Sequence, residues 1–301
     1  MSNPRIVSLV PSATDWIAAL GLADHVVGCT HECRLPDGRQ VPVVVAPAVH
    51  HDASDPAGVD AAVTRAAAEL VPLYGLDMDL VDELAPDIVV TQELCDVCAV
   101  SASTVRQMLQ ARPGTRVVNM TGVTLDGVFT DGLALASALG VQARGTEVVA
   151  ALRRRVGAVA DAVRAAARPT VSFLEWTDPG WVAGHWVPDQ IEAAGGRCRV
   201  GRSGQPSYRD DLAAFAGSDV LLVGPCGYDL DEAAGAATAL GERLPEAGAI
   251  WAVNANAMWS RPAPAVVDGI EALAGILHPD RMPAPGRDLA RCLTPAPAVT
   301  G

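Results

Sequence analysis

The sequence predicts an α/β protein of two lobes, on three observations. Short runs rich in Val and Ile alternate with alanine-rich helical stretches over residues 6–119. The same alternation returns over residues 170–277. Between the two blocks, residues 126–167 have a helical pattern with one break at Gly140. Alternation of this kind is typical of mostly parallel sheets covered by helices. We therefore expect two Rossmann-like α/β lobes joined by one long backbone helix.

The expected boundaries follow from these blocks. The amino-terminal lobe covers residues 1–123, the connecting helix residues 124–168, and the carboxy-terminal lobe residues 169–301. The second half of the connecting stretch is rich in Ala, Val and Arg and contains no Pro, so it is long for a helix inside a compact domain. A rigid strut between the lobes is the structure that this stretch indicates.

In the first lobe, β-branched runs predict the strands and alanine-rich or apolar-periodic stretches predict the helices. We expect strands at 6–10, 25–29, 42–45, 87–91 and 116–119, and helices at 11–21, 59–73, 80–84 and 101–111. Pro11 opens the first helix, and Ser12 followed by Asp15 resembles a capping box.

The second lobe repeats the pattern. We expect strands at 170–174, 219–223 and 250–253, and helices at 189–194, 230–244 and 264–277. The tail after His278 is rich in Pro, Ala and Gly, and we expect it to fray.

Composition narrows the partners and the compartment. The chain has 301 residues and a formal net charge of −13, which argues against nucleic acid or an anionic membrane as a partner. No apolar run approaches the length of about 20 residues that a membrane span needs. The first residues read as a strand rather than a signal peptide, and seven cysteines do not suggest a disulfide framework. We therefore expect a cytoplasmic protein with free thiols and without membrane insertion.

The segments that follow the predicted strands concentrate the unusual side chains. Ligands of open α/β sheets bind beyond the carboxyl ends of the strands. Aromatic residues make up only 4% of the chain. The Trp, Tyr, His and Cys residues of these segments are His31, Cys33, Cys95, Cys98, Trp176, Trp181, His185, Trp186, Cys226, Tyr228 and Trp259.

The chain resembles the helical-backbone (class III) substrate-binding proteins for cobalamin and ferric siderophores of ABC transporters. The resemblance runs from RIVSLVPSATDWIAALGL, VGCTHECRLP and LAPDIVVTQ to FLEWTDPGWVAGHW, DVLLVGPCGYD and IWAVNANAMWSRPAPAVVDGIEALAGILHP. THEC and LCDVC look most like a cytosolic-type subgroup described as cobalamin-binding. The resemblance implies two α/β lobes on one long helix, with the ligand in a cleft between the lobes.

The resemblance also implies the ligand and its contacts. The ligand would be cobalamin or a related corrinoid, or another metal chelate, held by side chains of the strand-end loops. Carried onto this sequence, the binding residues are Ser12, Thr14, His31, Glu32, Gln92, Trp176, Trp181, His185, Trp186, Tyr228 and Trp259. Tryptophan and tyrosine suit a flat ligand because they bury a large area and keep a polar edge.

The Cys95-x-x-Cys98 pair leaves three interpretations open. A redox pair would sit at a helix start of a thioredoxin-like fold, which the order of elements here does not match. A zinc or iron site would combine Cys95 and Cys98 with Cys33 and His31, a Cys3His set. The third interpretation is that the cysteines line a pocket as small apolar residues or contact the ligand directly.

The family resemblance is compatible with several functions, of which transport is considered first. Exported members of the family dock on a membrane permease through an acid on each lobe, and here Asp210 or Asp211 of the second lobe could serve. The matching stretch of the first lobe, residues 100–104, has no acid, so permease docking is doubtful. We expect a cytoplasmic binder of a small molecule. The alternatives are a metal- or thiol-dependent enzyme on the same fold and, more weakly, a sensor that reports ligand occupancy to a partner.

Overall fold

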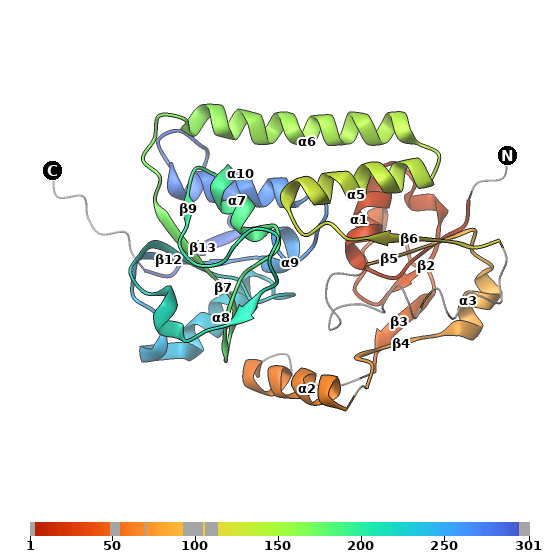
Figure 1. Cartoon of the computed structure of the whole chain (residues 1–301), viewed down its shortest axis with the longest axis horizontal. Helices are drawn as coiled ribbons and strands as arrows, with labels where there is room; N and C mark the ends of the chain where they lie inside the picture. Colours follow the sequence, from red (N-terminus) through yellow and green to blue (C-terminus); the bar gives the residue numbers. More distant parts are fainter. Residues whose placement is uncertain (1–3, 49–54, 70, 93–104, 106–113, 295–301) are drawn as a thin grey trace. The chain divides into compact units, whose positions relative to one another are not determined.

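A computed structural model of the chain describes residues 4–48, 55–69, 71–92, 105 and 114–294. Figure 1 shows two β-sheets with helices packed on them. The predicted mixed α/β class is confirmed. By internal contacts the chain divides into two compact units: unit 1 holds residues 1–51, 61–122 and 126–150, and unit 2 holds residues 52–60, 123–125 and 151–301.

The described residues of unit 1 form a six-stranded sheet in the order β4-β3-β2-β1-β5-β6. Its strands are β1 (Ile6–Ser8), β2 (Val26–Thr30), β3 (Val43–Pro47), β4 (Tyr74–Leu76), β5 (Ile88–Gln92) and β6 (Arg116–Met120). Neighbouring strands pair in parallel, except β3 and β4, which are antiparallel. The central strands are continuous apolar runs because both faces of a parallel sheet are covered.

The helices of this part of the chain are α1 (Pro11–Ala19), α2 (Pro56–Ala68), α3 (Met78–Leu84) and α5 (Leu125–Ala138), with 3-10 turns η1 (Ala23–His25) and η2 (Pro36–Gly38). Val81 of α3 packs with Val7 and Val89 of the sheet in one apolar cluster. The fully buried Trp16 of α1 fills the space left by Gly132 of α5. A side chain at position 132 would collide with the indole ring.

Helix α1 begins as predicted, but for a different reason. Val10 is the N-cap and gives no side-chain hydrogen bond, while Pro11 occupies the first helical turn. Proline suits this position because its missing N–H would have no partner there and its φ is already helical. The predicted capping role of Ser12 is therefore wrong.

The break predicted at Gly140 is present. Helix α5 ends at Ala138, Gly140 has φ of +77°, and α6 spans Gln142–Val163. A left-handed residue just after a helix end is the usual place for glycine, which adopts this φ without strain. The predicted connector of residues 124–168 is thus two helices. The division by contacts falls inside α6, between Ala150 and Ala151.

In unit 2 the strand order is β10-β8-β7-β11-β12-β13, with β9 also paired to β7. The strands are β7 (Thr170–Thr177), β8 (Gly180–Val182), β9 (Arg197–Cys198), β10 (Tyr208–Arg209), β11 (Ser218–Val223), β12 (Ala247–Val253) and β13 (Ala290–Cys292). The central β7, β11 and β12 are parallel, while β8, β10 and β13 pair antiparallel with their neighbours.

The helices of unit 2 are α7 (Val187–Ala193), α8 (Leu230–Leu240), α9 (Ala255–Met258) and α10 (Val266–Leu277), with the 3-10 turns η4 (Leu212–Phe215) and η5 (Gly241–Arg243). Leu174 packs with Ala237 and Leu240 of α8. Its neighbour Phe173 stacks on Trp259, next to α9. Since successive strand residues point to opposite faces, helices cover both faces of this sheet.

Sequence reasoning found the long strands and missed most of the short ones. The short strands β4, β8, β9, β10 and β13 were not predicted, because two or three residues give no readable period. The three-residue β1 was predicted, since it lies in the apolar run of residues 6–10. The helix predicted over residues 101–111 lies outside the described residues apart from Val105. Among the described helices, none combines the length and apolarity needed to cross a bilayer.

Candidate ligand-binding site

In each unit, the predicted binding residues lie at or beyond the carboxyl ends of neighbouring parallel strands. In unit 1 these strands are β2, β1 and β5, which are adjacent in the sheet. Ser12 and Thr14 follow β1, residues 31–33 follow β2, and Gln92 ends β5. The carboxyl ends of adjacent parallel strands meet at one edge, so the fold brings these polar residues together.

Ser12 connects the first helix to β5. Its Oγ donates a hydrogen bond to Oε1 of Gln92 at 3.0 Å, and its side chain is 2% exposed. For the amide nitrogen of the half-buried Gln92, no partner is found among the described residues. This pair is a polar anchor at the strand edge.

A set of hydroxyls and thiols, which we call the thiol–hydroxyl group, consists of Ser8, Thr14, Cys29, Thr30 and Cys33. Oγ1 of Thr14 lies 2.8 Å from Oγ of Ser8 and 2.9 Å from Sγ of Cys33. Oγ1 of Thr30 lies 3.3 Å from the same sulfur. The backbone N–H of Cys33 donates to the carbonyl of Thr30, which folds Cys33 back over the end of β2.

This group favours the thiolate form of Cys33. Hydrogen bonds from Cys29, then from Thr14 and Thr30, outweigh burial and lower its pKa to about 6. The pKa of Cys29 moves the opposite way, first because its thiol donates to Cys33 and second because it is buried. A thiol near its neighbours' donors ionises easily, and the thiolate is the reactive form of cysteine.

His31 lies at the end of β2 with its side chain 32% exposed. Its Nδ1 is 3.3 Å from the carbonyl of Val45, and its ring centroid is 6.2 Å from that of Tyr74. Nε2 is 4.0 Å from Oε1 of the exposed Glu32, which is too long for a hydrogen bond. Among the described residues, Nε2 has no hydrogen-bond partner.

In unit 2, Trp176 and Trp181 form what we call the tryptophan pair. They occupy partner positions on the antiparallel strands β7 and β8, and both are half-buried. The ring of Trp176 packs edge-on against Tyr228, with centroids 5.3 Å apart at 70°. Partner residues on antiparallel strands point to the same face, so the pair presents flat aromatic area on one side of the hairpin.

The polar edges of the tryptophan pair are held by residues that sequence reasoning missed. Nε1 of Trp181 donates to Oδ1 of Asp60 at 3.2 Å, and Nε1 of Trp176 donates to the carbonyl of Pro56 at 3.0 Å. The guanidinium of Arg209 lies 5.4 Å from the ring centroid of Trp181 and also pairs with Asp60 at 2.9 Å. Asp60 carries no sequence signal, because it stands in an alanine-rich helix like any solvated acid.

Three other predicted contacts are buried. Trp186 is 6% exposed and donates through Nε1 to the carbonyl of Trp259 at 2.9 Å. Trp259 is 3% exposed and Tyr228 is 7% exposed. The side chains of Trp186 and Trp259 thus belong to the core of unit 2, and we leave them out of the proposed site. Tyr228 acts as the support behind Trp176.

His185 is presented by an unusual backbone. Its φ is +51°, and its N–H donates to the carbonyl of Gln205 at 2.7 Å while its own carbonyl accepts from Gly204 at 3.0 Å. Left-handed conformations of such residues are uncommon and cluster at functional sites. Burial lowers the pKa of the imidazole, which favours its neutral form. Its ring nitrogens have no hydrogen-bond partner among the described residues.

The predicted metal set cannot be assembled from the described residues. Cys95 and Cys98 lie outside them, so the Cys3His hypothesis stays a prediction. Within the described ranges, no three His, Cys, Asp or Glu side chains are grouped as a metal ion requires. Cys33 and His31 instead make the hydrogen bonds given above.

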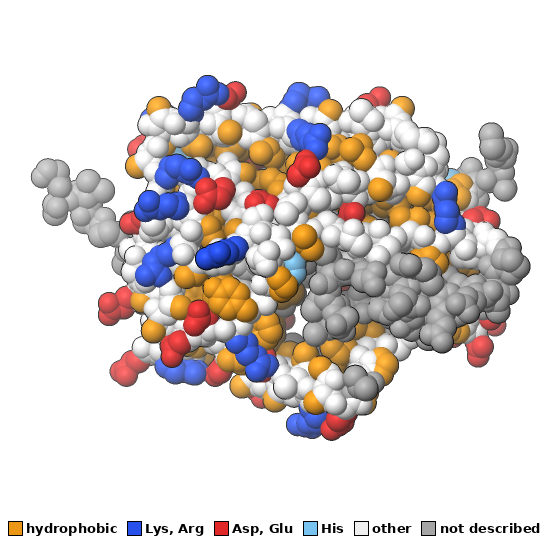
Figure 2. All heavy atoms as spheres, viewed as in Figure 1, with side chains coloured by type: hydrophobic (Ala, Val, Ile, Leu, Met, Phe, Trp, Pro, Cys, Tyr) orange, Lys and Arg blue, Asp and Glu red, His pale blue; other side chains and the backbone are white. Residues whose placement is uncertain are grey.

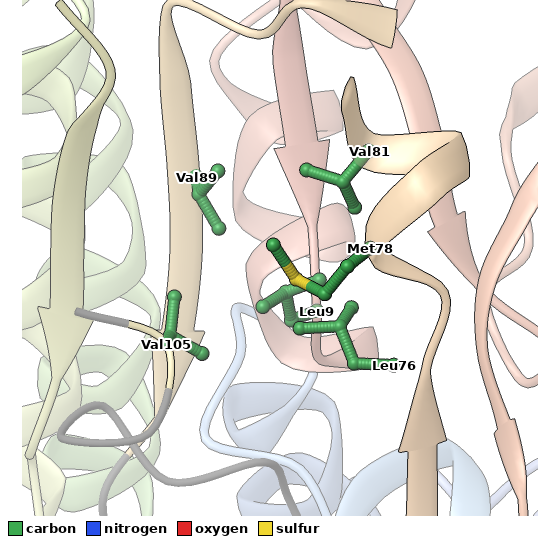
Figure 3. A pocket seen from close by; sticks show the side chains of 6 residues that line it. All are labelled: Leu9, Leu76, Met78, Val81, Val89 and Val105. Atoms are coloured by element: carbon green, nitrogen blue, oxygen red, sulfur yellow. The ribbon is translucent and has the colours of Figure 1, made fainter. Parts of the chain in front are cut away.

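Two hollows lie within the described parts of the units. A cavity of about 10 Å³ lies between the sheet of unit 1 and α3, lined by apolar side chains such as Leu9, Met78 and Val105 (Figure 3). That volume is at the limit for a single water molecule, and an apolar lining favours a dry void. A surface hollow of about 540 Å³ in unit 2 is lined by Asp178, Asp210, Glu242 and Arg243, among others.

The distribution of charged side chains on the surface agrees with the negative net charge of the sequence. Figure 2 shows arginine and acidic side chains interspersed over the described surface, with no continuous basic area on that face. Phosphate backbones bind where positive charge is clustered.

Comparison with known sequences gives a consistent result. The cobalamin-binding protein of Halobacterium salinarum is 29% identical over 289 residues, which cover 91% of this chain and 69% of that protein. The same match is found in two strains of that organism.

Solved structures share the fold at low identity. A periplasmic heme-binding protein from Pseudomonas aeruginosa matches with a TM-score of 0.70 and 19% identity, covering 98% of this chain and 99% of that one. The periplasmic vitamin B12 binding protein of Vibrio cholerae matches with a TM-score of 0.62 and 17% identity, covering 91% and 96%. These likenesses establish the two-lobed fold.

A match to a protein-family model shows the family of the chain. The periplasmic binding protein model matches residues 6–208, which is more than half of the chain and includes the strand ends of unit 1 and the tryptophan pair. The chain therefore belongs to the periplasmic binding protein family.

Proposed function

We propose that the chain is a solute-binding protein for a flat, metal-bearing macrocycle, and that this ligand is a cobalamin-like corrinoid. Two lines support the ligand class. The Halobacterium salinarum relative is a cobalamin-binding protein, and the structural neighbours include binders of heme and of vitamin B12. The choice of a corrinoid over haem rests on the first of these, because it is the relative with the higher sequence identity.

The tryptophan pair is the observation that carries the proposal. Two indoles in register, backed by Tyr228, provide the rigid flat area that a macrocycle can cover at small entropic loss. Their N–H groups are already bound to Pro56 and Asp60, so their orientation is set before the ligand arrives. Preorganisation of this kind raises affinity because less freedom is lost on binding.

His185 is the candidate metal donor in unit 2. A neutral imidazole is the form that coordinates metals, and burial favours the neutral form of this ring by lowering its pKa. Backbone hydrogen bonds with Gln205 and Gly204 hold the residue in its left-handed conformation. We propose that one ring nitrogen of His185 binds the metal of the macrocycle axially.

Unit 1 would contribute polar contacts. The free amide nitrogen of Gln92 and Nε2 of His31 are suited to the carbonyl and amide groups at the rim of a corrinoid. That the ligand lies between the two lobes stays a prediction. We also propose that the protein is cytoplasmic, and fractionation of host cells would test this location. That it does not dock on a permease in the usual way is a separate proposal.

Binding and coordination are tested by adding hydroxocobalamin, haemin or metal-free protoporphyrin to the purified protein. We expect hydroxocobalamin to bind with micromolar affinity or better, quench tryptophan fluorescence, and change its visible spectrum as an imidazole replaces the cobalt-bound water. His185→Ala should keep fluorescence quenching and lose the spectral change. His25→Ala is the matched histidine control and should behave as the wild type.

Three outcomes contradict the proposal in whole or in part. Failure of all three macrocycles to bind would remove the ligand class. Tighter binding of haemin than of hydroxocobalamin would replace the corrinoid by haem. An unchanged spectral shift in His185→Ala would remove His185 as the metal donor and leave binding itself intact.

A further inference from the structure

The first residues of helix α2 cover the polar edges of the tryptophan pair. By internal contacts, residues 52–60 belong to unit 2, together with both tryptophans. The carbonyl of Pro56 accepts a hydrogen bond from Nε1 of Trp176 at 3.0 Å. Oδ1 of Asp60 accepts one from Nε1 of Trp181 at 3.2 Å. One end of one helix therefore binds both indole N–H groups.

Asp60 also binds an arginine of the strand next to Trp181. One guanidinium nitrogen of Arg209 lies 3.0 Å from Oδ1 and 2.9 Å from Oδ2 of Asp60. The guanidinium also lies over the ring of Trp181, 5.4 Å from its centroid. Arg209 of β10 and Trp181 of β8 are partners in an antiparallel pair, so their side chains point to the same face of the sheet. Neighbouring strands thus present a cation and an indole N–H to one carboxylate, whose side chain is 15% exposed.

Apolar packing gives α2 little support. Of its 13 residues, all of them described, only Ala66 is buried. A helix of this length is marginal by itself in water, and most helices in proteins depend on a buried apolar face. Segments with few buried apolar contacts open at a low free energy. The polar contacts of Pro56 and Asp60 are therefore a major part of what holds α2 in place.

We propose that Asp60 and Arg209 form a latch, which holds α2 against the edges of the tryptophan pair and must open before a ligand can enter or leave. The role in ligand exchange rests on the proposed function of the tryptophan pair. The attachment of α2 does not, because it is made by residues of the chain itself. Asp60 and Arg209 are positioning residues in this proposal, since they act through Trp181 and α2.

The size of the ligand connects the latch with ligand exchange. A macrocycle is wider than an indole ring, so a ligand on the tryptophan pair extends beyond the ring edges. The edges that carry Nε1 face Pro56 and Asp60, so the ligand lies beside the beginning of α2. Arg209 covers one face of Trp181 and leaves the other face for the ligand. The ligand is then bordered by α2, and its exchange is faster when α2 is released.

The contacts of the latch are specific in geometry but can open at moderate cost. A carboxylate that accepts hydrogen bonds from a guanidinium and an indole N–H has its direction fixed. Arg209 is 47% exposed, so water screens its attraction to Asp60 and hydrates the guanidinium when the pair separates. Asp60 reaches water as soon as α2 moves away. Opening therefore leaves no buried charge without a partner, which is the case that makes a broken ion pair costly.

The attachment of α2 is tested first without a ligand. Amide hydrogen exchange of the full-length chain, read by mass spectrometry of peptic peptides, follows α2, with α10 as the internal reference. Asp60→Asn keeps an oxygen for the N–H of Trp181 and removes the charge that binds Arg209, whereas Asp60→Ala removes both contacts. We expect exchange across α2 to rise about 3–10-fold in Asp60→Asn and about 10–100-fold in Asp60→Ala. Exchange across α10 should stay unchanged.

Two controls identify the cause of any change. Asp231→Asn removes another acid of unit 2, which pairs with Arg291 at 2.6 Å, and should leave exchange across α2 at the wild-type rate. In the wild type, exchange across α2 should rise with salt concentration, because salt screens the attraction between Asp60 and Arg209. The salt test needs no variant, so it decides the question even if Asp60→Ala does not fold.

The role in ligand exchange is tested by stopped-flow fluorescence with hydroxocobalamin. Because Asp60→Asn keeps the orientation of Trp181, it should speed both binding and release about 3–10-fold and leave the affinity within about twofold of the wild type. Loss of an ordinary binding contact would instead speed release alone and weaken the affinity. Asp231→Asn should exchange hydroxocobalamin at wild-type rates.

Each half of the proposal has its own contradicting outcome. Unchanged exchange across α2 in Asp60→Ala, or wild-type exchange that does not respond to salt, would overturn the latch. Wild-type rates of hydroxocobalamin binding and release in Asp60→Asn, together with faster amide exchange, would overturn its role in ligand exchange. If hydroxocobalamin, haemin and protoporphyrin all fail to bind the wild type, the proposed function fails instead, and the amide-exchange results still decide the attachment of α2.

Discussion

The two units place different chemistry on the same kind of scaffold. Both have central parallel strands whose carboxyl ends meet at one edge. Unit 1 fills that edge with small side chains, the Ser12–Gln92 pair and the thiol–hydroxyl group. Unit 2 fills it with the tryptophan pair and His185. The sheet therefore determines where a site can form, while the loops that follow its parallel strands determine the chemistry of that site.

The two units also differ in how deeply their tryptophan side chains are buried. Unit 1 keeps Trp16 wholly in its core. Unit 2 divides its tryptophans, with Trp186 and Trp259 buried and Trp176, Trp181 and Trp251 half-buried. Residues of one type and one stretch of sequence thus serve stability in one case and, in our proposal, ligand binding in the other.

The largest expected effect separates these two roles of tryptophan. Trp186→Ala should lower the free energy of unfolding by about 3–5 kcal/mol, because it opens a large cavity and leaves the carbonyl of Trp259 without its donor. Trp181→Ala should lower it by no more than about 1 kcal/mol, since the ring is half-buried. Chemical denaturation followed by circular dichroism measures both. Equal losses would show that Trp181 is a core residue too.

The next effect concerns affinity. Trp181→Ala should weaken hydroxocobalamin binding about 10–100-fold, because a central aromatic contact and its preset orientation are lost. Tyr208→Ala is the matched control, since Tyr208 is 45% exposed on β10 but lies on the opposite face from Arg209, whose strand partner is Trp181. Isothermal titration calorimetry measures the affinities. A larger loss in Tyr208→Ala would place the ligand on the other face of the sheet.

A third effect is the pH dependence that Cys33 gives to unit 1. Its folded pKa of about 6 is below the usual value of 9.0, so between these values the unfolded chain binds more protons. The stabilisation is therefore present at the upper end of this window and is lost as pH falls through 6. Above pH 9 the raised pKa of Cys29 reverses the trend, because Cys29 then ionises only on unfolding.

Comparison of wild type with Cys33→Ser measures this contribution. The difference in unfolding free energy should be about 2 kcal/mol larger at pH 8 than at pH 6. Cys198→Ser, which removes a thiol whose pKa is raised to about 11, should show no such change over the same interval. A difference that is flat with pH in Cys33→Ser would mean that Cys33 is an ordinary protonated thiol.

The architecture could be predicted from sequence because its signals are local. Buried parallel strands are apolar runs, and the start at Pro11 and the break at Gly140 depend on the residues at those positions. The family resemblance that the sequence showed is confirmed by the match over residues 6–208. The short edge strands gave no signal because two or three residues carry no period.

The roles of individual site residues depend on partners far along the chain. Ser12 looks like a capping residue, yet its partner Gln92 lies 80 residues away. Trp181 and Trp186 stand in one aromatic segment, but only Trp186 meets the carbonyl of Trp259, which is 73 residues away. Asp60, 121 residues from Trp181, could not be distinguished from a surface acid. Tertiary packing decides such contacts, and no local pattern encodes them.

The smallest expected effect compares two arginines on helix α6, one grouped with each unit. Arg155 binds Asp268 and Glu271 of α10 at 2.6 Å, whereas Arg144 pairs with Glu147 of its own helix at 3.5 Å. Arg155 is 39% exposed and its acids 47% and 37%, so water screens much of the attraction. Arg155→Ala should therefore cost about 1 kcal/mol, reflecting the two-acid geometry rather than a buried charge.

Arg144→Ala should cost no more than about 0.3 kcal/mol, the range of exposed pairs within one helix. Because the Arg155 contribution is a screened attraction between charges, it should shrink at high salt, while the Trp186 effect should not. Denaturation of the three variants at low and high salt separates these causes. Salt-independent destabilisation by Arg155→Ala would show that the packing of its side-chain stem, and not its charge, holds α6 to α10.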